Sequence, residues 1–112
     1  MRDDRRPTER WIRANIRRCS AQGIYAAVAR RGETRRGTVL LKLNMIEAGC
    51  RVLSQLRDMD GGLGWLAAFD GKLVPEAEAD AYIDRAVRRD PDLWVVEIKD
   101  RLGRNVFGGE VL

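Results

Sequence analysis

Apolar residues recur along this chain with two different periods, and each period predicts one type of secondary structure. Spacings of three and four over residues 9–22 and 75–89 predict two amphipathic helices. Shorter stretches, in which apolar residues alternate with polar ones or run together, predict strands. Five strands are expected, at residues 24–31, 38–44, 50–57, 63–69 and 93–99.

The stretch with the strongest preference for β-structure runs from Leu93 to Ile98, directly after Asp90, Pro91 and Asp92. The proline disfavours helical angles in the residue before it, so the second helix is expected to end there. Five of the six residues from 93 to 98 are apolar, which is typical of a strand covered on both faces. Glu97 is the exception, and its carboxylate must reach solvent or a cation, because an unpaired buried charge is costly.

The order helix, four strands, helix, strand predicts an α+β fold. We expect the four strands to form an antiparallel meander, with the final strand beside the first and both helices on one face of the sheet. This strand order, 4-3-2-1-5, places the apolar strand 93–99 at an edge. Exposed apolar edges favour association, so the pattern also predicts a homo-oligomer.

The length of 112 residues fits a single domain. Residues 1–7 are expected to be a charged, frayed leader, and residues 106–112 a short edge strand or a tail. No apolar run approaches the roughly 20 residues of a membrane span, and no signal segment follows the charged start. These features predict a cytoplasmic protein without membrane contact. Cys19 and Cys50 are too few for a disulfide framework.

Basic residues are concentrated near the beginning of the chain. Residues 1–36 contain eleven arginines and four acidic residues, whereas the remainder is slightly acidic. On the first predicted helix, one group of arginines could bind a polyanion: Arg10, Arg13, Arg17 and Arg18. Two other interpretations compete with this one, a solvated helix face and the arginine bias of a GC-rich genome, since 18 of the 21 basic residues are arginine.

The composition restricts the chemistry that the chain can perform. It contains no histidine, which excludes histidine-based catalytic dyads and zinc sites of the mixed Cys/His type. We therefore predict no metal and no cofactor, and no catalytic residue is assigned. A second candidate group follows the last predicted helix: Glu97, Asp100, Arg101 and Arg104. These residues could form an interaction site or orient a substrate, and an ion-pair network that closes a turn is the alternative.

The chain resembles a small family of uncharacterised bacterial proteins that is catalogued as a domain of unknown function. The resemblance rests most specifically on the segment Asp-Pro-Asp-Leu-Trp-Val-Val-Glu at residues 90–97. Further similarity lies in the regions 11–19, 31–32, 39–44 and 100–103. The resemblance implies a soluble cytoplasmic bacterial protein, and it implies no activity, cofactor or site residues.

Three classes of function remain open at this point. The first is a non-enzymatic interaction module that forms homo-oligomers or binds another protein. The second is a basic module that contacts RNA, DNA or the ribosome through the arginines of the first helix. The third is an enzyme that uses carboxylates and arginines.

Overall fold

The computed structural model describes residues 7–57 and 62–112, which form two α-helices and a six-stranded mixed sheet. The leader was predicted at residues 1–7. Residues 1–6 lie outside the described residues, and Pro7 directly precedes the first helix. The elements follow one another as α1 (Thr8–Ala21), β1 (Tyr25–Arg30), β2 (Val39–Asn44), a 3-10 turn (Ile46–Ala48), β3 (Cys50–Arg57), β4 (Leu63–Ala67), a 3-10 turn (Ala68–Gly71), α2 (Glu76–Arg89), β5 (Trp94–Lys99) and β6 (Glu110–Val111).

The sheet has the strand order β1-β5-β2-β3-β4-β6, so the α+β class is confirmed but the predicted order is wrong. β5 does pair antiparallel with β1, as expected, but it also pairs in parallel with β2. It therefore separates the two strands that were expected to form the first hairpin. The apolar composition of β5 explains this position, because a central strand is covered on both faces and bonded on both sides. The meander holds only for β2, β3 and β4.

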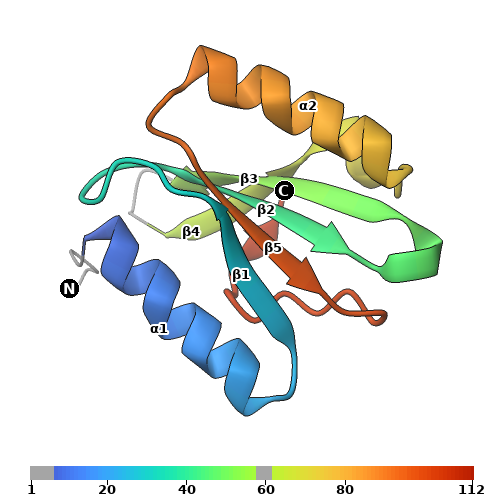
Figure 1. Ribbon diagram of the computed structural model, residues 1–112, viewed down its shortest axis with the longest axis horizontal. Coiled ribbons are helices and arrows are strands. Elements are labelled where there is room, and N and C mark those ends of the chain that lie inside the picture. Colours follow the sequence, from blue (N-terminus) through green and yellow to red (C-terminus); the bar gives the residue numbers. More distant parts are fainter. Residues whose placement is uncertain (1–6, 58–61) are drawn as a thin grey trace.

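The two helices lie on opposite faces of the sheet, and the prediction that they share one face is wrong (Figure 1). Successive residues of a strand point to opposite faces, so an all-apolar strand can support a helix on each side. On β2, Leu41 packs in the cluster beneath α1, and its neighbour Leu40 packs in the cluster beneath α2. Each helix therefore buries its apolar face against its own side of the sheet.

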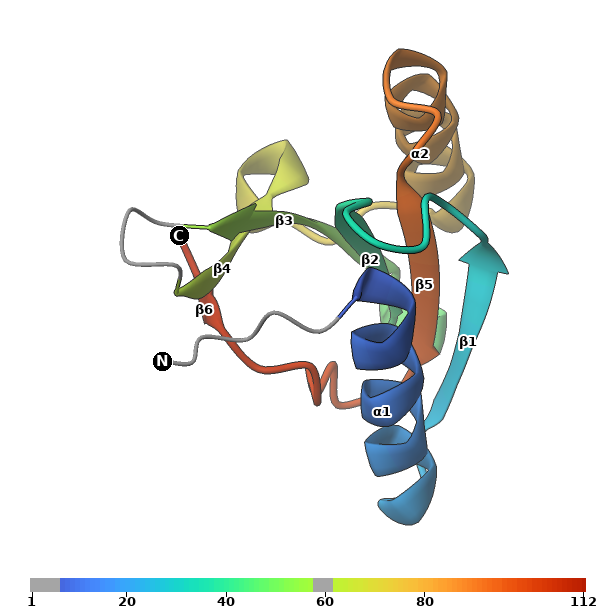
Figure 2. The same ribbon diagram turned by 90° about the vertical axis from the view of Figure 1, so that its left-hand side faces the viewer.

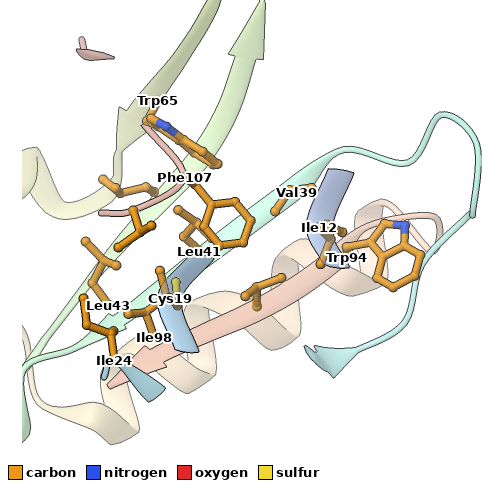
Figure 3. Packing of buried hydrophobic residues seen from close by; sticks show 13 residues of the cluster. Ile12, Cys19, Ile24, Val39, Leu41, Leu43, Trp65, Trp94, Ile98 and Phe107 are labelled. Atoms are coloured by element: carbon orange, nitrogen blue, oxygen red, sulfur yellow. The ribbon is translucent and has the colours of Figure 1, made fainter. Parts of the chain in front are cut away.

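The larger core lies between α1 and the sheet, and it is closed at one end by the segment after β5 (Figure 3). Ile12 and Cys19 of α1 are fully buried there. Phe107 covers the cluster and meets the ring of Trp11 edge to face, with ring centroids 5.4 Å apart. Trp65 donates a hydrogen bond from Nε1 to the carbonyl oxygen of Gly108, which ties the C-terminal segment to β4. The smaller core lies beneath α2 and centres on Val52, Val95 and Ile83.

Residues 31–37 connect β1 to β2 by passing over the beginning of β5, which explains why this connection is too long for a tight hairpin. At Gly32 and at Gly37, an added Cβ would clash with the carbonyl oxygen of Asp92 and would meet the ring of Trp94. The absence of a side chain at both positions lets this loop lie directly on β5. Its two glycines therefore serve close packing rather than a hairpin turn.

Candidate functional site

The four arginines predicted as a polyanion site lie on α1, and all four are exposed. Arg13 pairs with Glu9, with Nη2 3.0 Å from Oε2, and Arg18 donates a hydrogen bond to Oδ1 of Asn15. Arg10 and Arg17 make no ion pair or side-chain hydrogen bond within the part of the chain that the structure describes. The helix thus presents a basic surface, two of whose members are partly engaged by their own helix.

The structure adds a second basic segment beside α1, which the helical spacing of the arginines did not indicate. The loop of residues 31–37 accepts hydrogen bonds from the first amides of the helix: Thr8 donates to Arg35 and Glu9 donates to Thr34, through the backbone. Arg31 also pairs with Glu9 at 2.8 Å. The loop therefore lies next to the first turn of α1 (Figure 2). The hydroxyl of Thr8 also bonds to this loop, through the carbonyl oxygens of Arg35 and Gly37, and no side chain caps α1.

Glu33 holds the arginine end of this loop in one conformation. Its Oε1 accepts hydrogen bonds from the backbone amides of Arg35 and Arg36, at 3.1 and 2.6 Å. These two bonds lower the pKa of the Glu33 carboxyl, with that from Arg36 contributing most. Its carbonyl oxygen accepts a 2.7 Å hydrogen bond from Nε1 of Trp94. The Arg35 and Arg36 side chains therefore project from a fixed backbone.

The four residues of the second predicted group do not meet at one site. Asp100 and Arg104 pair with each other at 2.8 Å and close the turn after β5. Hydrogen bonds from Arg104 lower the pKa of Asp100 to about 2. Arg101 pairs instead with Glu47, and both side chains are largely exposed. Glu97 faces α2, away from this turn.

Glu97 belongs to a network around Lys42, which supplies the cation that this carboxylate was expected to need. The Lys42 side chain is only 9% exposed, although it carries a charge. Its Nζ lies 2.7 Å from Glu76 and from Asp80 on α2, and 3.6 Å from Glu97 on β5. Asn44 donates a 3.0 Å hydrogen bond to the same Glu97 oxygen. The sequence signal for this network was the polar pair Lys42 and Asn44 on one face of an apolar strand.

The same network forms one end of a groove between α2 and β1. The groove has a volume of about 330 Å³. No residue of β1 joins the core beneath α2, so this edge of the sheet is left uncovered by the helix. We call the cavity the α2 groove, and its lining residues are Ala29, Arg30, Lys42, Asp80, Ile83, Asp84, Val87, Val95 and Glu97.

The groove combines an aliphatic middle with charged ends. Arg30 closes one end by donating hydrogen bonds to the carbonyl oxygens of Pro91 and Leu93. The side chain of Asp84 makes no ion pair or hydrogen bond to any described residue, and it is exposed on α2. The arrangement suits an aliphatic chain that ends in a cation, because the hydrocarbon stem and the charge each find a matching part of the lining.

The side chains that could act as nucleophiles are poorly suited to that role, because the pKa of each is raised. Burial alone would lower the pKa of Lys42, but hydrogen bonds to Asp80 and Glu76 raise it well above its usual value, so its amine stays protonated. Burial also raises the pKa of the Cys19 and Cys50 thiols, which disfavours the reactive thiolate. Within residues 7–57 and 62–112, no group of acidic or cysteine side chains forms a metal site, and no helix could span a bilayer.

Comparison with known proteins places this architecture in one family. Residues 7–108 match the family described as "Protein of unknown function (DUF1491)". No curated protein matches the chain. Two solved structures of a DUF1491 family protein from Caulobacter crescentus CB15 are similar. The crystal structure is 40% identical, with a TM-score of 0.83 over 95% of this chain and 98% of that one. The NMR structure is 39% identical, with a TM-score of 0.82 over 98% and 99%.

A solution structure of an A. tumefaciens protein is 27% identical, with a TM-score of 0.71 over 86% of each chain. The family match covers nearly all of the described residues, and the similar structures share the fold along their length. The chain therefore belongs to the DUF1491 family of proteins of unknown function.

Proposed function

We propose that this protein is a non-enzymatic interaction module, which binds an extended segment of a partner protein along the edge of β1. The observation that carries the proposal is that the free edge of β1 runs beside the α2 groove. β1 is a terminal strand of the sheet, and residues 25–29 carry no charge. An edge strand presents unpaired amides and carbonyls, which an extended peptide can pair with.

Charge complementarity indicates what the bound segment should contain. An added strand would lie about 4.8 Å from β1. A lysine or arginine on its α2-facing side could therefore reach across β1 into the groove. Ala27 pairs with Glu97 in the sheet register and faces the same side, so its small side chain leaves this path open. Asp84 then offers an unpaired carboxylate to the incoming cation.

The argument for a homo-oligomer changes with the strand order. Its basis was an apolar strand at an edge, and β5 is central instead. Self-association stays a prediction that light scattering after size exclusion tests. A second copy is the weaker candidate for the β1 edge, because an antiparallel pairing of two β1 strands about Ala27 carries the partner's arginines away from the groove.

The binding proposal is tested with two synthetic peptides of about eight residues, one alternating valine with lysine and the other valine with glutamate. In two-dimensional NMR titrations of the labelled protein, the lysine peptide is expected to shift the amide signals of β1 and of the groove. The glutamate peptide should leave them unchanged. Equal shifts with both peptides, or shifts confined to α1, would contradict the proposal.

A matched pair of variants separates the groove from general charge effects. Ala27→Lys places a long basic side chain of the protein itself over the groove, so it should abolish binding of the lysine peptide. Ala81→Lys adds the same charge at an exposed position of α2 that does not line the groove, and it should bind as the parent protein does. Equal losses in both variants would show that net charge, rather than the groove, governs binding.

A further inference from the structure

We infer that the other face of the molecule carries a second binding site, an arginine surface for the phosphate backbone of double-stranded nucleic acid. This inference goes beyond the proposed function, because α1 and α2 lie on opposite faces of the sheet. The arginine surface consists of residues from α1 and from the adjacent loop: Arg10, Arg13, Arg17, Arg31, Arg35 and Arg36. All six are exposed, and two of them, Arg13 and Arg31, pair with Glu9.

The first step of the argument is that two segments far apart in the sequence are fixed against each other. Glu9 accepts ion pairs from Arg13 on its own helix and from Arg31 on the loop, both at Oε2. Backbone hydrogen bonds join the first turn of α1 to Thr34 and Arg35. A surface that is already ordered loses less conformational entropy when it binds. The arrangement therefore favours binding more than the same arginines on a flexible tail would.

The second step concerns which charges are free. Arg13 and Arg31 share the carboxylate of Glu9, and the carboxylate of Glu33 bonds to backbone amides. Among the described residues, no carboxylate pairs with the guanidinium groups of the other four members, Arg10, Arg17, Arg35 and Arg36. Unpaired guanidinium groups bind phosphate oxygens well, because their donors match the geometry of the anion.

The third step identifies the kind of polyanion. Single strands are held by stacking on exposed aromatic rings, but here Trp94 is buried beneath Arg31 and Trp11 packs against Phe107. Membrane surfaces are held partly by exposed apolar side chains. The large exposed apolar residues of the described chain all lie outside α1 and the loop of residues 31–37. Contacts to a duplex backbone need neither feature.

The helix terminus itself contributes little to this site. The amides of Thr8 and Glu9 are already bonded to the loop carbonyls, so they cannot also bind a phosphate. The site therefore depends on the side chains, and affinity should follow the number of arginines that reach the duplex. For four to six phosphate contacts, affinity should fall by about two to three orders of magnitude between roughly 50 and 200 mM salt.

The test is fluorescence anisotropy of a labelled DNA duplex of about 20 base pairs, titrated with the full chain across that salt range. The double variant Arg35→Gln/Arg36→Gln is expected to bind at least tenfold more weakly at low salt, with a salt slope reduced by about two. The control is Arg88→Gln/Arg89→Gln, another adjacent pair of exposed arginines, at the end of α2. It should bind as the parent protein does, and thermal melts confirm that both variants are folded.

Several outcomes would overturn the inference. Absence of binding by the parent protein at low salt would remove the site. An equal loss of duplex affinity in the control variant would show that net charge, and not the arginine surface, governs binding. Tighter binding of the single strand than of the duplex would contradict the assignment to a duplex backbone. Binding to phosphatidylserine vesicles without binding to DNA would identify a lipid surface instead. None of these outcomes affects the peptide test of the α2 groove, which uses different residues and the opposite ligand charge.

Discussion

Nζ of Lys42 lies 2.7 Å from Oδ1 of Asp80, which joins the middle of the sheet to the helix above it. Lys42 projects from a strand whose six residues are all buried. Asp80 lies on α2, and about half of its side chain is exposed. The pair therefore fixes where α2 lies across the sheet. Lys42 and Asp80 also line the α2 groove, so the same contact forms part of its wall.

Replacement of Lys42 by methionine should destabilise the protein by about 2–3 kcal/mol at neutral pH. The substitution keeps most of the buried volume, but it leaves the carboxylates of Glu76, Asp80 and Glu97 close together without their cation. Urea denaturation at neutral pH measures this difference.

Addition of Glu97→Gln to the Lys42→Met variant should restore part of the lost stability, because it removes the least exposed of the three carboxylates. A Lys42→Met protein as stable as the parent at neutral pH would show that the network contributes no net stability. In that case the Lys42–Asp80 contact would not determine the position of α2.

The Asp100–Arg104 pair predicts a separate pH dependence in the acidic range. The pKa of Asp100 is about 2 in the folded protein, below its usual 3.8. A lowered folded pKa gives stability that is present above the unfolded pKa and is lost as the pH falls toward the folded one. Asp100→Asn should therefore cost about 1–2 kcal/mol at neutral pH. Its difference from the parent should disappear between about pH 4 and pH 2, as followed by thermal melts, and a constant difference would rule out the pair as its source.

Substitution of Gly37 by alanine tests whether the loop of residues 31–37 lies directly on β5. A Cβ at this position would meet the carbonyl oxygens of Asp92 and Glu33, so a loss of about 2–3 kcal/mol is expected. Gly23 provides the matched control. It has a φ of +73° but no neighbour within reach of an added Cβ, so Gly23→Ala should cost only about 1 kcal/mol. Equal losses in chemical denaturation would show that the loop does not pack against β5.

The positions of the elements could be read from the sequence because local signals determine them. Asp90 and Pro91 end α2, and hydrophobic periodicity locates both helices and the main strands close to their observed bounds. The strand order could not be read in the same way, because the pairing of β1 depends on competition between β2 and β5. The apolar run from Leu93 to Val96 already argued for a central strand, and that signal was stronger than the preference for a short-range hairpin.

The candidate sites were less accessible to sequence reasoning, because they form between distant segments. Glu97 was recognised as a carboxylate that needs a cation, but its partner Lys42 lies more than 50 residues earlier in the chain. In the sequence, Arg35 and Arg36 look like ordinary loop residues. Their loop lies beside α1 because β5 separates β1 from β2 in the sheet. Sequence periodicity describes one element at a time, so it does not report such contacts.

Hydrogen exchange provides the direct test of the strand order on which both proposed sites depend. In the observed sheet, β5 is bonded on both sides, whereas β1 has a free edge. The amides of Val95 and Val96 should therefore exchange only on global unfolding, while the outward-facing amides of β1 should exchange at least about 100-fold faster. The order 4-3-2-1-5 would give the reverse pattern, with the first strand protected and alternate amides of the last strand exposed. Fast exchange along residues 94–99 would therefore contradict the central position of β5, and with it the free edge of β1 and the course of the loop of residues 31–37.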